Sequence, residues 1–415
     1  MHWFTLAFVL ALALATAARL WLAARHVQHI AAHRDTVPEE FSSRVTLAGH
    51  QKAADYTTAR TRLKMVDSLI DALVVLGFTL GGGLQWLAHL GERFFESGGY
   101  WHGIALIVSV ALISGAVELP FSLYRTFVIE ARFGFNRMTI ALFIADLGKQ
   151  LALAALLGVP FAFCVLWLMA RMGEAWWVYV WATWIGFNVL VVTIYPTVIA
   201  PLFNKFSPLE DAALKDRIER LLARCGFRAR GLFVMDSSRR SSHGNAYFTG
   251  FGTAKRIVMF DTLLERLAPP EIEAVLAHEL GHFSRRHVWK RLALMFAVSL
   301  VFLWLLGFLI RQDWFYSGLG VSTQSTAMAL VLFFMVIPSF AFLLQPLASL
   351  YSRRHEYEAD AYAAEQASGE DLAHALVKLY RDNASTLTPD PLHSAFYDSH
   401  PPAALRIARL QASGR

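Results

Sequence analysis

Two histidines and a glutamate within residues 274–287, "AVLAHELGHFSRRH", have the spacing of a metal-activated hydrolase. His278 and His282 are four residues apart, so on a helix they share one face and could bind one Zn²⁺ through neutral imidazoles. Glu279 lies between them and is placed to take a proton from a zinc-held water, whose pKa falls to about 7. Pro269 and Pro270, followed by acidic residues, are typical of a helix start. The sequence therefore predicts a zinc-binding helix over this stretch.

The third ligand distinguishes two classes of zinc hydrolase. The metzincin pattern needs a glycine and a histidine where this chain has Arg285 and Val288, so that class is excluded. The other class takes a glutamate from a second helix. Glu356, within "SRRHEYEADAYA" at residues 352–363, can complete a His₂Glu site.

Asp360 follows Glu356 by four residues and shares its helix face. It would face the same centre, either orienting a ligating imidazole or donating a proton during turnover. His355 and Glu358 are rival ligands, but their side chains point off that face. The same pattern is also typical of a surface helix with charge pairs such as Arg354 with Glu358.

The elements that must position these residues belong to a membrane protein. Of the 415 residues, 56% are hydrophobic and 17% are charged, and the mean hydropathy is +0.42. Soluble domains carry about 25% charged residues. The net charge of +6 lies in loops between apolar segments, so we expect it to set topology and expect no nucleic-acid partner.

Seven segments are long and apolar enough to be transmembrane helices, which need about 20 residues each. The predicted fold is an all-α multi-span membrane protein with a small α+β zinc metalloprotease domain on the cytoplasmic side. Four parts follow from the spans: the N-terminal membrane region, the protease domain with the zinc helix, the last two spans, and a C-terminal part with the third ligand. They cover residues 1–201, 202–291, 292–350 and 351–415. The spans are residues 3–24, 65–90, 101–123, 150–170, 176–198, 292–310 and 326–350.

Lysine and arginine are divided unevenly between the two sides of this arrangement. One side holds 34 of the 38 and the other holds three. Because basic loops stay in the cytoplasm, we predict that the basic side is cytoplasmic and the N-terminus lies outside. Both candidate ligand segments are on the basic side, so the metal is expected at the cytoplasmic membrane surface. The basic side comprises residues 25–64, 124–149, 202–291 and 351–415.

A basic cluster precedes the sixth span. We interpret it as an anchor that contacts lipid headgroups rather than as part of the metal site. Its members are Arg285, Arg286, His287, Lys290 and Arg291.

Five segments, in chain order, resemble those of the type I CAAX prenyl proteases, integral-membrane zinc metalloendopeptidases related to bacterial heat-shock membrane proteases. The resemblance implies His278, His282 and Glu356 as ligands of one zinc ion per chain and Glu279 as general base. It also implies a large water-filled chamber enclosed by the seven spans. The segments are residues 127–139 ("FVIEARFGFNRMT"), 195–211 ("YPTVIAPLFNKFSPLED"), 237–264, 352–363 and 398–407 ("DSHPPAALRI").

The resemblance gives roles to further residues. His400 would steady the oxyanion, and Arg406 would orient the acidic groups of the site. Asn245, Ala246 and Tyr247 match an edge-strand motif, in a stretch whose β-rich arms flank a turn near residues 250–253. That edge could pair with an extended substrate, or the hairpin could simply cap the zinc helix.

The predicted function is a membrane zinc endopeptidase that faces the cytoplasm and processes C-terminal CAAX-type or other membrane-associated peptides. The expected partners are a peptide or protein substrate, with or without a lipid, and the bilayer, and the chain is expected to be a monomer. The alternative is a quality-control protease for damaged membrane proteins. A transporter or lipid-binding bundle, or an inactive metal-bound scaffold, would be the rival classes. The Ala- and Arg-rich composition favours a bacterial inner membrane; in a eukaryote the endoplasmic reticulum membrane is expected.

Overall fold

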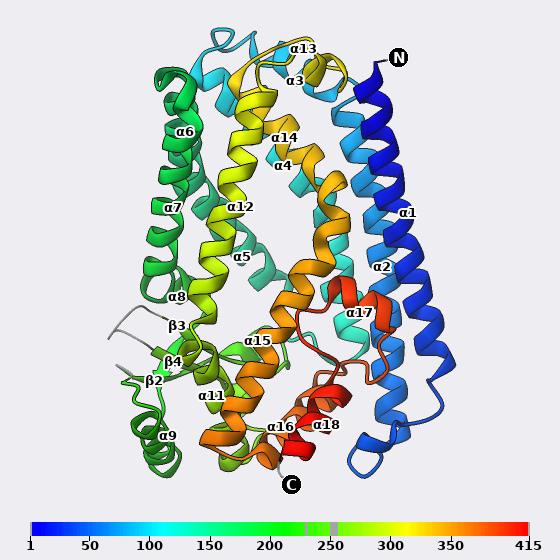
Figure 1. Ribbon diagram of the computed structural model, residues 1–415, viewed down its shortest axis with the longest axis vertical. Helices are drawn as coiled ribbons and strands as arrows, with labels where there is room; N and C mark the ends of the chain where they lie inside the picture. The colour runs from blue at the N-terminus through cyan, green and yellow to red at the C-terminus, as the bar shows by residue number, and fades with distance from the viewer. Residues whose placement is uncertain (1, 229–230, 250–255, 414–415) are drawn as a thin grey trace.

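Long helices run along the longest axis of the computed structural model, which describes residues 2–228, 231–249 and 256–413 (Figure 1). The N-terminus lies at one end and the C-terminus at the other, among the short helices and the sheet (Figure 1). The helices of the N-terminal half are α1 (Trp3–Ala32), α2 (Leu47–Phe78), α3 (Gly83–Gly91), α4 (Tyr100–Tyr124), α5 (Ile140–Leu153), α6 (Val159–Arg171), α7 (Trp176–Ile194), α8 (Ala200–Phe203) and α9 (Ala212–Arg224). Those of the C-terminal half are α10 (Asp261–Leu264), α11 (Pro269–Ser284), α12 (His287–Leu309), α13 (Asp313–Ser317), α14 (Thr326–Ala341), α15 (Gln345–Gln366), α16 (Gly369–Asp382), α17 (Pro391–Tyr397) and α18 (Ala403–Ser413).

Six helical stretches within the described ranges are long and apolar enough to cross a membrane. Several join neighbouring helices through a π-helical or 3₁₀ turn, and they extend beyond the predicted segments. The second predicted span, residues 65–90, is divided between α2 and α3, and the first half of α2 is rich in charge. α2 packs along α1 for much of its length (Figure 1), so a count of seven spans stays a prediction. The six stretches are Trp3–Ala32, Tyr100–Glu130, Ile140–Arg171, Gly173–Phe203, His287–Leu309 and Thr326–Gln366.

The predicted α+β domain is present at the end of the molecule that carries the C-terminus. Its sheet has the order β1-β2-β4-β3, with β2 parallel to β4 and the outer pairs antiparallel. β3 therefore forms an edge, and the predicted turn between β3 and β4 lies outside the described residues. The strands are β1 (Phe206–Pro208), β2 (Leu232–Met235), β3 (Ala246–Thr249) and β4 (Arg256–Phe260).

Two separate apolar cores hold the two parts of the molecule. One lies among the long helices and includes Phe8, Leu166 and Phe333. The other packs the sheet against α9, α11, α16 and α18 and includes Ile257, Leu280 and similar buried residues. Helices α11 and α15 belong to the second core, and each continues into a membrane helix, α11 into α12 after a sharp turn and α15 from α14 (Figure 1).

Candidate metal centre

Helix α11 is fixed by buried acidic side chains in its first turns. It starts at Pro269, as the prolines predict. Glu271 accepts a hydrogen bond from Lys378 Nζ (2.7 Å), and buried Glu273 accepts one from Arg224 Nη2 of α9 (2.8 Å). These contacts tie α11 to α16 and α9, so the rest of the helix has a defined position and orientation.

Helix α15 lies against α11 at very short range. A Cβ atom added at Gly281 would be 2.9 Å from Ala359 Cα and 3.1 Å from the Ala359 carbonyl oxygen. Ala359 is fully buried. Glycine on one helix and alanine on the other therefore let the backbones approach, which brings side chains close to this contact on each helix face to face.

Those side chains are His278, His282 and Glu356, whose potential ligand atoms all lie within 4.8 Å of one another. His278 Nε2 is 3.5 Å from Glu356 Oε2, and His282 Nε2 is 3.4 Å from Glu356 Oε1. Ligands at 2.0–2.1 Å from a tetrahedral zinc ion would be about 3.3 Å apart, close to these separations. Glu356 Oε2 is buried and accepts no hydrogen bond from the described residues. The donor set and its spacing thus fit a small divalent cation.

Asp360 and Arg406 form a second layer behind His278. Asp360 Oδ1 is 2.9 Å from His278 Nδ1, which leaves Nε2 directed to the cluster. Arg406 donates two hydrogen bonds to the same carboxylate, at 2.8 and 2.6 Å, and both side chains are buried. Such bidentate pairing stabilises the ionised carboxylate, so this geometry favours Asp360 as an orienting acceptor over Asp360 as a proton donor.

His282 has its own second layer, which sequence reasoning assigned to other roles. His282 Nδ1 lies 3.0 Å from His287 Nδ1, and His287 Nε2 lies 2.9 Å from Glu358 Oε2. The arrangement is consistent with each histidine passing a donated hydrogen bond outward, so that His282 Nε2 stays free for a metal. The His287 side chain is 1% exposed, so it is not the lipid-facing anchor that the sequence suggested. No helical period links His282 to His287 because the turn at Arg286 interrupts the helix.

Loss of this relay is expected to weaken metal binding. Replacing Glu358 by Ala removes the acceptor that orients His287, and we expect zinc affinity to fall about 10- to 100-fold. Competition with a chelating dye measures the zinc affinity of each variant. Glu365→Ala, an exposed glutamate on the same helix, is the control. Equal affinities in the two variants would show that the relay does not orient His282.

Electrostatics differ among the three residues of the HExxH motif. Burial and the nearby His278 lower the pKa of His282 to about 3, so its imidazole is neutral and available as a ligand. Burial alone would lower the pKa of His278, but its interactions with the Asp360 and Glu356 carboxylates raise it to about 9. A metal ion bound at His278 would therefore displace a proton from it. Desolvation raises the pKa of Glu279, as suits a base that must hold a proton part-way through a reaction.

The remaining predicted residues lie around this cluster. His400 Nε2 is 3.4 Å from Glu356 Oε2, and the His400 side chain is 58% exposed, so it borders the open side of the site. Asn245 precedes the edge strand β3, and Ala246 and Tyr247 belong to it. β3 packs against α11, the helix that carries both histidines.

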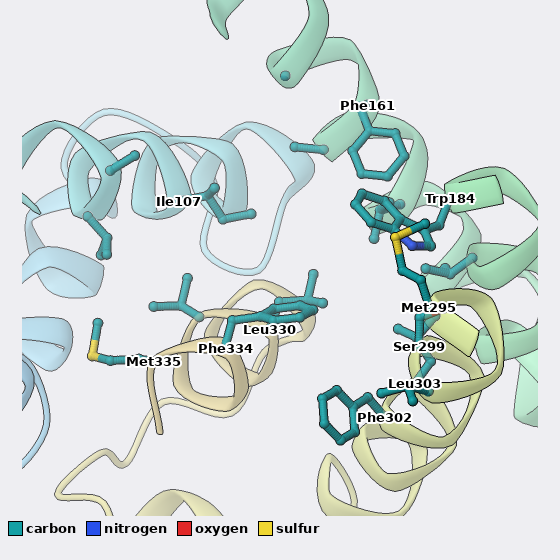
Figure 2. Close-up of a pocket in the computed structure, with 18 of the residues that line it drawn as sticks. Ile107, Phe161, Trp184, Met295, Ser299, Phe302, Leu303, Leu330, Phe334 and Met335 are labelled. Carbon is teal, nitrogen blue, oxygen red and sulfur yellow. The ribbon is translucent and has the colours of Figure 1, made fainter. Parts of the chain in front are cut away.

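A cavity of about 1150 Å³ lies among the long helices, and its lining is predominantly apolar (Figure 2). Phe161, Trp184, Met295 and Phe334 surround it. Arg291 is among its lining residues, and Arg291 Nη2 is 3.9 Å from Glu356 Oε1. The Arg291 side chain therefore connects the cavity lining with the metal cluster.

A second cavity of about 620 Å³, with a larger share of polar groups in its lining, adjoins the first and shares Val75, Ser114 and Met335 with it. Lys64, Asp67 and Glu118 are among its lining residues. The charged groups that could hold water in the expected chamber therefore line the smaller of the two adjoining hollows.

Each half of the chain matches a model of a known protein family. Residues 26–205 match the model described as "CAAX prenyl protease N-terminal, five membrane helices", and residues 208–413 match "Peptidase family M48". The boundary between the two matches falls at β1.

Named relatives and a solved structure match over nearly the whole length. The chain is 35% identical over 394 residues to "CAAX prenyl protease 1 homolog" of Oryza sativa subsp. japonica, covering 92% of each chain. The protein of the same name from Arabidopsis thaliana is 34% identical over 389 residues, covering 92% of this chain and 91% of the relative. The crystal structure of S. mikatae Ste24p superposes with a TM-score of 0.91 at 31% identity and covers 99% of both chains.

Proposed function

The chain belongs to peptidase family M48 and is a multi-span membrane metallopeptidase of the CAAX prenyl protease type, and we propose that it uses zinc to cut peptides close to a lipid-modified C-terminus. The observation that carries the proposal is a His₂Glu cluster linked through Arg291 to the lining of a large apolar cavity. A hydrolytic site and a space suited to a lipid chain are thereby joined in one molecule.

Zinc is supported by the donor set. Two imidazoles and one carboxylate are the ligands that zinc takes in hydrolytic sites, and the fourth position stays open. The ligands would be His278, His282 and Glu356, held by the Asp360–Arg406 pair and by the His287–Glu358 relay. When bound, the ion supplies a Lewis acid for the peptide carbonyl and lowers the pKa of water.

The chain's own groups would then move protons and hold charge. Glu279 accepts the proton of the attacking water on its carboxylate and later gives it to the leaving amine nitrogen. His400 Nε2–H, on the open side of the cluster, donates to the carbonyl oxygen as negative charge develops there. Asp360 keeps the proton of His278 on Nδ1 and takes no part in the transfer.

All of these residues come from one chain, so the reaction requires no second copy and we propose a monomer. The excess of lysine and arginine around the protease domain supports a site that faces the cytoplasm. The membrane would be the inner membrane in a bacterium, or the endoplasmic reticulum membrane in a eukaryote.

Cleavage of matched peptides tests the function. The purified chain is given two peptides of one sequence that end in Cys-aliphatic-aliphatic-X, one with an isoprenyl group on the cysteine and one without. We expect cleavage after the cysteine, loss of cleavage with a chelator, and a KM at least about tenfold lower for the lipidated peptide, because its chain is buried in the apolar cavity. Mass spectrometry of the products locates the cut.

Other outcomes of that experiment have distinct meanings. No cleavage with zinc bound would leave an inactive scaffold. Equal cutting of both peptides and of unfolded membrane-protein segments would favour quality control over CAAX-type processing.

The edge strand β3 supports a role in substrate binding. Asn245 O accepts a hydrogen bond from Phe260 N (3.0 Å), so in the antiparallel register the backbone N–H of Ala246 points away from β4. That N–H donates to Asn245 Oδ1 (2.8 Å), so an extended substrate could pair with this edge by replacing the Asn245 side chain as acceptor. We propose Asn245, Ala246 and Tyr247 as the substrate-binding segment.

Ala246→Pro removes the outward N–H, which donates to Asn245 Oδ1 and would turn to the substrate backbone on binding, at a position where an edge strand tolerates proline. We expect kcat/KM to fall about two- to tenfold, as for one lost hydrogen bond, with zinc content and thermal stability unchanged. Steady-state kinetics on the lipidated peptide measures the change. An unaltered kcat/KM would assign β3 to capping α11 instead.

A further inference from the structure

A hollow of about 600 Å³ lies on the outer face of α15, away from the metal cluster's open side. This volume is in the range of small-molecule pockets. We call it the arginine pocket. Four guanidinium groups surround it. They belong to Arg285 at the C-terminal end of α11, Arg353 and Arg354 of α15, and Arg409 of α18. The other lining residues are Leu350, Tyr357, Glu358 and Ala361.

The position of the arginine pocket along α15 coincides with a change in the exposed face of the helix. Leu343, Leu347 and Leu350 are 72%, 63% and 57% exposed. The same face continues, at helical spacing, to Arg354 and Ala361. A face that passes from leucine to arginine within one turn is expected where a membrane helix leaves the acyl chains and enters the headgroup layer.

The charges of the arginine pocket leave an excess of positive charge. Glu358 is the acidic residue in the lining; Arg354 Nε donates to it at 3.1 Å, and it also accepts from His287. Arg353 donates to the carbonyl oxygens of Asp398 (3.2 Å) and Ser394 and to Ser394 Oγ (2.9 Å), all uncharged acceptors, so it is held in place and keeps its charge. The Arg409 guanidinium lies 4.6 Å from the centre of the Tyr357 ring. The lining itself carries one carboxylate and four guanidiniums, a composition that suits an anion with several oxygen atoms.

We propose that the arginine pocket binds the phosphate of an anionic phospholipid headgroup in the leaflet next to the protease domain. Guanidinium groups recognise phosphate oxygens through paired, charge-assisted hydrogen bonds. The exposed leucines beside the pocket would contact the acyl chains of the same lipid. Free phosphate has the same headgroup chemistry but nothing to place on those leucines, so we assign the pocket to a lipid.

Lipid binding by the whole chain in an uncharged detergent tests the proposal independently of protease activity. Native mass spectrometry and titration calorimetry measure the binding of three probes to the chain: dihexanoyl phosphatidylglycerol, dihexanoyl phosphatidylcholine and inorganic phosphate. We expect one phosphatidylglycerol site per chain. The variant Arg354→Gln/Arg409→Gln should bind about 30-fold more weakly, from about five- to sixfold for each arginine lost near a membrane surface. The control Lys215→Gln/Arg220→Gln removes the same charge from the exposed face of α9 and should bind like the parent chain.

Three results would overturn the proposal: equal affinity for phosphatidylglycerol and phosphatidylcholine, unchanged affinity in the pocket variant, or inorganic phosphate binding as tightly as the lipid. Zinc content and thermal unfolding establish that each variant is folded. If the glutamine variant does not fold, Arg354→Lys/Arg409→Lys keeps the charge without the paired donors. We expect weaker phosphatidylglycerol binding in that variant, and parent-like affinity would also overturn the proposal.

Discussion

Replacing Glu279 by Gln should lower kcat for peptide hydrolysis about 10²- to 10⁴-fold and leave zinc in place. The amide has the size of the carboxylate but cannot accept the proton of the attacking water, and general-base catalysis contributes this range of rate. The ligand atoms of His278, His282 and Glu356 are unchanged, so the metal should remain. A fluorogenic peptide measures kcat, and elemental analysis counts zinc per chain.

Glu265→Gln is the matched control for that variant. It makes the same chemical change at an exposed glutamate shortly before α11 and should have parent-like activity and zinc content. A Glu279→Gln variant that cut peptides at the normal rate would remove Glu279 from the mechanism. One that lost zinc would show instead that Glu279 helps to hold the site together.

Gly281→Ala should damage the protein through a single methyl group. That methyl would lie 2.9 Å from Ala359 Cα, and backbone atoms cannot move aside as a flexible side chain can. Overpacking of this kind costs about 1–3 kcal/mol of unfolding free energy. Helix α11 carries two candidate ligands and α15 carries the third. Pushing the two helices apart would therefore also change the distances between the ligand atoms. A misplacement of about 1 Å can cost about 100-fold in rate.

The matched control is Gly148→Ala in α5, where an added Cβ would meet nothing within 4 Å. Alanine is a better helix former than glycine by about 1 kcal/mol, so this variant should be as stable as the parent or slightly more so. Thermal unfolding, zinc affinity and kcat are compared for both variants. If Gly281→Ala matched Gly148→Ala in all three, the close approach of α11 and α15 would not be what sets the site.

Local pattern was enough to identify the three candidate ligands that the structure brings together and most of the membrane helices. His278 and His282 follow from the helical period, and hydropathy located six stretches that the structure also has. Glu356 was found because it follows the last span, and the resemblance of five segments supplied the family. These features depend on residues near one another in sequence, where spacing and composition carry the information.

Tertiary structure decided how those residues are held and what surrounds them. Nothing in the sequence linked His287 to His282, because a helix break separates them and their contact depends on where α12 begins. The sequence did not show that Gly281 faces Ala359, nor that the main cavity is apolar. The Gly281–Ala359 contact joins segments about 80 residues apart along the chain, and the geometry of both contacts is set by how the helices pack rather than by local propensity. The sequence alone therefore indicates which side chains could bind a metal, whereas the distances between them are set by how the helices pack.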